Sequence, residues 1–135
     1  MKILIVDDDL NNQILLTFIL KPYGECIVAK DGREAVALFN KHLTKGDPFD
    51  LIFLDIMMPQ MNGQEALREI RWLEKEANRA YRGAEYHPVI IMQTALGEPR
   101  DMEEAFFEGK CNGYITKPFT HNDVLEKLRR YHLID

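Results

Sequence analysis

The sequence has few residues that could form crosslinks, and it lacks any long apolar stretch. Its two cysteines, Cys26 and Cys111, are not spaced as in a zinc or redox motif, and its four histidines share no metal-binding spacing and are expected at the surface. No apolar run approaches the roughly 18 residues that a membrane-spanning helix requires. The run Ile3–Val6 near the N-terminus is too short for a signal peptide, and acidic residues follow it directly. These absences predict a soluble, cytoplasmic chain with reduced cysteines and no membrane partner.

An excess of positive charge is also lacking. The formal net charge is -5, whereas an isolated nucleic-acid-binding domain needs a basic surface. Hydrophobic residues make up 46% of the 135 residues and charged residues 29%, as is typical of a globular domain with a buried core. There is no internal repeat, low-complexity tract or linker. We therefore expect a single domain over residues 1–135, with no output domain and no direct contact with nucleic acid.

Short apolar runs alternate with amphipathic segments along the chain. Runs of four or more apolar residues predict strands that are buried on both faces, as in a parallel sheet covered by helices. Because right-handed crossovers place helices on both sides of such a sheet, the alternation predicts an α/β fold with a doubly wound parallel sheet. Strands are expected near residues 3–6, 26–29, 51–55, 89–92 and 112–116, and helices include 64–80, 99–108 and 120–131.

Polar residues follow the ends of four predicted strands. They are Asp7 and Asp8 after the first strand, Asp55 at the end of the third, Thr94 after the fourth and Lys117 after the fifth. In an open α/β sheet these positions share one edge. Two carboxylates about 4 Å apart repel by on the order of 4 kcal/mol, so the cluster must take up protons or bind a cation, for which Mg²⁺ (or Mn²⁺) is suited. A carboxylate, a divalent cation, a lysine and a hydroxyl together predict phosphoryl transfer onto Asp55.

The residues at these strand ends belong to four blocks that resemble the receiver domain of two-component response regulators, among them single-domain chemotaxis regulators. The blocks are Val6-Asp7-Asp8, Leu54–Gly63, Thr94-Ala95 and Gly113–Phe119, and the match runs from Lys2 to the last predicted helix. The resemblance implies a flavodoxin-like fold, with a five-stranded parallel sheet in the order 2-1-3-4-5 and five helices.

The resemblance also implies a magnesium site around the phosphoacceptor. Asp55 would accept the phosphoryl group and bind Mg²⁺. Asp8 would bind the ion directly and Asp7 through water, and the backbone carbonyl of Met57 would complete the protein ligands.

Three further roles are implied by the resemblance. Lys117 would bind the phosphoryl group, and the peptide bond before Pro118 would be cis. Thr94 would move toward a phosphoryl oxygen and Tyr114 would turn inward behind it, so that the two act as a switch.

The implied partner is a sensor histidine kinase or a histidine phosphotransfer protein, and the phosphorylated domain would signal to a downstream protein through its fourth helix and fifth strand. The domain would assist its own phosphorylation and dephosphorylation without being an enzyme of metabolism. One alternative is a Mg²⁺-dependent phosphohydrolase of small molecules, which would need a second acid where Met57 stands. Another is an FMN-binding domain, whose phosphate loop would not be acidic, and a third is a degenerate receiver that only binds a partner. The segment Lys75–His87 is interpreted as a helix extension, a partner surface or a surface insertion.

Overall fold

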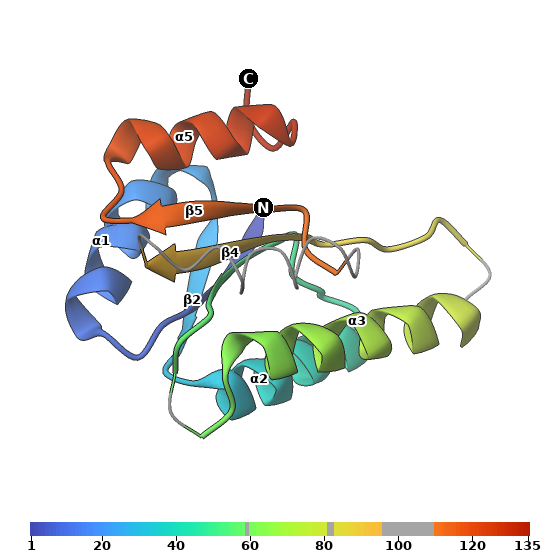
Figure 1. The fold of residues 1–135 in the computed structure, drawn as a ribbon. Coiled ribbons are helices and arrows are strands. Elements are labelled where there is room, and N and C mark those ends of the chain that lie inside the picture. Colours follow the sequence, from blue (N-terminus) through green and yellow to red (C-terminus); the bar gives the residue numbers. More distant parts are fainter. Residues whose placement is uncertain (59, 81–82, 96–109) are drawn as a thin grey trace.

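The computed structural model describes residues 1–58, 60–80, 83–95 and 110–135 (Figure 1). Within them, five parallel strands form one sheet in the order β2-β1-β3-β4-β5, which confirms the predicted topology. The strands are β1 (Lys2–Val6), β2 (Glu25–Ala29), β3 (Leu51–Asp55), β4 (Val89–Ala95) and β5 (Gly113–Lys117). The helices are α1 (Leu10–Leu20), α2 (Gly32–Thr44), α3 (Gly63–Ala80) and α5 (His121–Arg130), with a 3-10 turn at Lys21–Tyr23. The predicted helix at 99–108 lies outside the described residues.

The central strands β1 and β3 are buried on both faces, because each contains a continuous apolar run, Ile3–Val6 and Leu51–Leu54. In β1, Leu4 and Val6 pack in the core under α2 and α3, while Ile3 and Ile5 pack in the core under α1 and α5. Figure 1 shows these two helix pairs on opposite sides of the sheet. This arrangement is what continuous apolar runs predict, since alternate side chains of a strand point to opposite faces.

Side-chain caps fix the starts of the helices that lie next to the strand ends. Asp9, the residue before α1, accepts a hydrogen bond from the backbone N–H of Asn11 at 3.0 Å. Thr120 and Asp123 form a reciprocal capping box at the start of α5. Asp9 and Thr120 thus act as helix caps, and the first cap holds α1 directly behind the acidic loop.

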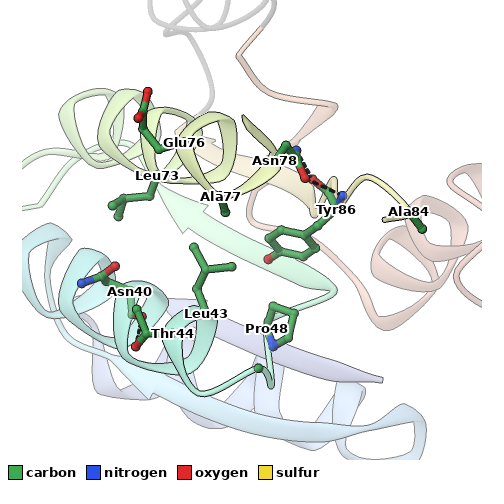
Figure 2. A pocket seen from close by; sticks show the side chains of 11 residues that line it. Asn40, Leu43, Thr44, Pro48, Leu73, Glu76, Ala77, Asn78, Ala84 and Tyr86 are labelled. Atoms are coloured by element: carbon green, nitrogen blue, oxygen red, sulfur yellow. Dashed lines mark hydrogen bonds between the residues drawn. The ribbon is translucent and has the colours of Figure 1, made fainter. Parts of the chain in front are cut away.

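Within the segment Lys75–His87, residues up to Ala80 extend α3, as one interpretation of the sequence predicted, and the Tyr86 ring packs against Phe39 of α2, with 6.2 Å between ring centroids. The Asn78 side-chain amide donates to the carbonyl oxygen of Tyr86 and accepts a hydrogen bond from its backbone N–H, both at 2.8 Å. The Tyr86 hydroxyl donates to the carbonyl oxygen of Phe49 at 2.6 Å. Figure 2 shows the Tyr86 ring beside a cavity between the two helices. The cavity has a volume of about 650 Å³ and includes Leu43, Pro48, Leu73, Ala77 and Tyr86 in its lining.

The prediction that the histidines lie at the surface is wrong for His42 and holds for His87. His42 was expected at the surface, but α2 continues to Thr44 and buries it to 8% exposure. Its ring packs edge-on against Phe49, with 5.0 Å between ring centroids. His87 is at the surface, yet its two ring nitrogens lie 2.6 Å and 2.8 Å from carboxylate oxygens of Glu74 and Glu85.

Within the described ranges, we find no helix with the length and apolar character that crossing a membrane requires.

Candidate functional site

Three carboxylates meet at the C-terminal edge of the two central strands. Val6 of β1 pairs with Leu54 of β3, so the residues that come next, Asp7 and Asp55, stand side by side. Asp7, Asp8 and Asp55 each offer a carboxylate oxygen, and these oxygens lie within 4.8 Å of one another. Asp7 is fully buried and Asp55 is 5% exposed, while Asp8 is exposed to solvent. The strand ends therefore bring together the acids that the sequence placed there.

Lys117 reaches this cluster from β5, two strands away from Asp55. Its ammonium nitrogen lies 2.9 Å from Oδ2 of Asp55 and 3.2 Å from Oδ2 of Asp7. The Lys117–Pro118 peptide bond is cis, as the resemblance implied. One cation is thus shared between two buried carboxylates, which leaves the site with an excess of negative charge.

The pKa values of Asp55 and Lys117 are both raised above their ordinary values. Burial raises the pKa of Asp55 to about 6, with a further contribution from the Asp7 charge, although Lys117 opposes the rise. Burial acts to lower the pKa of Lys117, but the contacts with Asp55 and Asp7 outweigh it and hold that pKa above its ordinary value. A group that brings positive charge to the carboxylates would relieve the repulsion between them.

Asp7 is also held by groups that the sequence did not single out. Its Oδ1 accepts the backbone N–H of Asp9 at 2.9 Å, and its Oδ2 accepts a hydrogen bond from Nδ2 of Asn12. The same Asn12 nitrogen donates to Oε1 of Gln93 at 2.8 Å. The signal available in the sequence was the lone amide Gln93, which directly precedes Thr94 in an otherwise apolar run.

The remaining candidates are Thr94, Tyr114 and Met57. Thr94 is 2% exposed at the end of β4, and its hydroxyl donates to the carbonyl oxygen of Ala95 at 3.3 Å. Tyr114 is half-buried in β5, with the Lys127 ammonium 5.5 Å from its ring centroid. The backbone N–H of Met57 donates to Oδ1 of Asp55 at 3.3 Å, and the Met57 side chain is 65% exposed.

The donor set of the cluster fits a hard divalent cation. It consists of carboxylate oxygens, two from buried residues and one from an exposed residue. Mg²⁺ and similar ions bind oxygen ligands and keep several of their waters, so an acid cluster that is open on the Asp8 side matches their preference.

Comparison with known proteins assigns the family. A family model of the response regulator receiver domain matches residues 3–129. The chain belongs to the response regulator receiver domain family. This receiver is 34% identical over 144 residues to Histidine kinase 3 of Arabidopsis thaliana, and the match covers 96% of the receiver but 13% of the kinase. The receiver therefore spans only a small part of the length of such plant kinases.

Solved structures share the same fold. The chemotaxis protein CheY4 of Vibrio cholerae has a TM-score of 0.75 to this receiver at 30% identity, and the match covers 96% of both chains. A co-crystal structure joins the Saccharomyces cerevisiae phosphotransfer protein Ypd1 with the receiver domain of Ssk1. It matches with a TM-score of 0.81 at 31% identity, covering 97% of this chain and 88% of that one. These matches confirm the predicted flavodoxin-like architecture.

Proposed function

We propose that this receiver is the phosphoacceptor of a two-component phosphorelay and that Asp55 takes a phosphoryl group from a histidine of a sensor kinase or phosphotransfer protein. The observation that carries the proposal is the meeting of Asp7, Asp8 and Asp55 with the Lys117 ammonium at one edge of the sheet. The proposal applies equally to a free receiver and to one within a longer chain, as in the plant kinase relatives.

In the proposed reaction, a carboxylate oxygen of Asp55 attacks the phosphorus of the phosphohistidine. The new O–P bond forms as the N–P bond breaks, and the imidazole leaves with the electron pair of the broken bond. Lys117, already 2.9 Å from Asp55, carries part of the charge on the phosphoryl oxygens. The chain thus supplies positioning and charge compensation, which are the main requirements of phosphoryl transfer.

Asp7, Asp8, Asp55 and the backbone carbonyl of Met57 are the groups we assign to a bound Mg²⁺, with Asp7 acting through water. When bound, the ion neutralises charge on the carboxylates and on the transferred group. Thr94 and Tyr114 are assigned to the response. The Thr94 hydroxyl would exchange its bond to the backbone of Ala95 for one to the phosphoryl group, and Tyr114 would follow, changing the surface around β5 that a downstream protein contacts.

The donor would dock against α1, because this helix carries exposed apolar side chains directly after the acidic loop. Leu10 is 66% exposed, Ile14 59% and Phe18 72%. Such a patch fits the apolar face of a helical partner that presents its histidine to Asp55. The yeast Ssk1 receiver, a structural relative, was crystallised with its phosphotransfer protein.

The test of the proposed function is the mass of the intact protein after incubation with acetyl phosphate and Mg²⁺. The mass is expected to rise by one phosphoryl group, and the rise should disappear in the Asp55→Asn variant and when EDTA replaces Mg²⁺. Asp9→Asn is the matched control, since asparagine caps a helix as well as aspartate does and Asp9 is not part of the acid cluster. An unchanged wild-type mass at saturating donor and metal would refute the proposal and favour a receiver that only binds a partner.

A further inference from the structure

Three polar residues stand in register across the sheet at the level of the acid cluster. Asp55 pairs with Gln93 of β4, and Asp7 lies beside Asp55 because Val6 pairs with Leu54. Registered neighbours in a parallel sheet point to the same face, and here that face lies under α1 and α5. Gln93 is therefore part of the row of polar groups that includes the proposed phosphoacceptor, and it is fully buried.

Asn12 of α1 connects the two ends of this row. Its side-chain nitrogen donates one hydrogen bond to Oε1 of Gln93 at 2.8 Å and another to Oδ2 of Asp7. Both hydrogens of the amide are thereby used. An ionised Asp7 can only accept, so Asn12 must present its nitrogen, and Gln93 in turn must present its oxygen. The negative charge on Asp7 therefore sets the direction of both hydrogen bonds, the one from Asn12 to Asp7 and the one from Asn12 to Gln93.

The burial of Gln93 is otherwise unfavourable. Among the residues that the structure describes, its Nε2 has no hydrogen-bond partner. A buried amide donor without a partner lowers stability, and the residue two positions earlier in β4, Ile91, packs in the apolar core on the same face. The contact that distinguishes a glutamine from an apolar residue here is the one its oxygen makes with Asn12.

We infer that Gln93 is a positioning residue for the Asp7 carboxylate and acts on it through Asn12. Without the Gln93 oxygen, Asn12 loses the bond that aims its nitrogen at Asp7. Oδ2 of Asp7 is then free to move toward Lys117, at present 3.2 Å away, and both groups leave the orientation that a bound cation and the phosphoryl group need. The inference rests on the proposed function, because it requires Asp7 to serve the metal site.

The test is the dissociation constant of Mg²⁺, measured by calorimetric titration of the phosphate-free protein with the metal alone. Gln93→Met keeps the size of the side chain and removes the acceptor. We expect it to weaken Mg²⁺ binding by about tenfold, the lower end of the range seen when a residue that supports a metal ligand is lost. Gln93→Asn, whose shorter amide falls short of Asn12, should do the same and serves if the methionine variant folds poorly.

A double-mutant cycle separates positioning from a general effect on stability. If Gln93 acts through Asn12, the double variant Asn12→Ala/Gln93→Met should bind Mg²⁺ no more weakly than Asn12→Ala alone. Ile91→Val is the matched control: it trims the same face of the same strand, should lower the unfolding midpoint and should leave the Mg²⁺ dissociation constant unchanged.

The outcomes distinguish this inference from the proposed function. Wild-type protein that neither binds Mg²⁺ nor gains a phosphoryl group would overturn both. If the wild type binds Mg²⁺ and becomes phosphorylated, but both Gln93 variants keep its dissociation constant within about twofold, only the inference fails. Losses that multiply in the double variant would also overturn it, because they would show that Gln93 does not act through Asn12.

Discussion

Charging Asp55 is unfavourable in the folded protein without a cation, so removal of that charge should stabilise the metal-free receiver. In Asp55→Asn the side chain keeps its shape and loses its charge, which ends the repulsion from Asp7. Lys117 keeps a carboxylate partner, since its ammonium also lies 3.2 Å from Asp7. We therefore expect a higher free energy of unfolding in EDTA for a variant that cannot accept a phosphoryl group.

The magnitude follows from the pKa of Asp55, which rises from 3.8 to about 6 on folding. The folded state binds this proton more tightly than the unfolded state, so stability falls as the pH rises from about 4 to about 6, and the loss is complete above that range. Each pKa unit corresponds to about 1.4 kcal/mol, which limits the effect to about 3 kcal/mol. Solvent screening reduces this figure, and we expect a gain of about 1 to 2 kcal/mol for Asp55→Asn at about pH 7.5.

Urea unfolding followed by circular dichroism at several pH values would measure this gain. The difference between Asp55→Asn and wild type should be largest above about pH 6 and should shrink toward zero below about pH 4. Added Mg²⁺ should raise the stability of the wild type, because a ligand that binds the folded state stabilises it, and should do so far less in the variant. A variant that is less stable than wild type at neutral pH, or a difference that does not depend on pH, would refute the electrostatic reasoning.

Three further predictions concern groups away from the acid cluster. Tyr86→Phe removes the 2.6 Å hydrogen bond to the Phe49 carbonyl and should lower the free energy of unfolding by about 1 kcal/mol, measured in urea. Glu74→Gln removes the charge that pairs with Arg71 at 2.7 Å and should lower the free energy of unfolding by about 2 kcal/mol in the same assay. Added salt should not lower the stability of the wild type by a similar amount, because both groups are largely buried and salt screens buried pairs weakly. Burial, followed by the nearby lysines, lowers the pKa of His42, so its contribution to stability should fall as the pH drops through about 6.5. The stability difference between wild type and His42→Phe should therefore change between about pH 7 and pH 5, and a constant difference would contradict this.

Much of the fold followed from local pattern. The apolar runs that became the central strands are continuous, and only a parallel sheet covered on both sides buries every residue of such a run. For the same reason the acids that come directly after β1 and β3 had to share one edge, and the structure brings Asp7, Asp8 and Asp55 together there. The helix caps Asp9 and Thr120 are likewise local features, because the groups that they satisfy lie within three residues in the chain.

The tertiary structure decided what depends on packing between distant segments. The α1 helix is apolar around most of its circumference, so periodicity did not show that Leu16, Ile19 and Leu20 would be buried while Ile14 and Phe18 stay exposed. His42 became a core residue only because α2 packs beside Phe49. The bond from Asn12 to Gln93 joins residues 81 positions apart. Gln93 stands out as a lone amide in an apolar strand, but nothing near it in the sequence indicates Asn12 as its partner. Composition and period thus determine which segments are buried and where the acids emerge, whereas the partner of each buried polar group is set only when the layers meet.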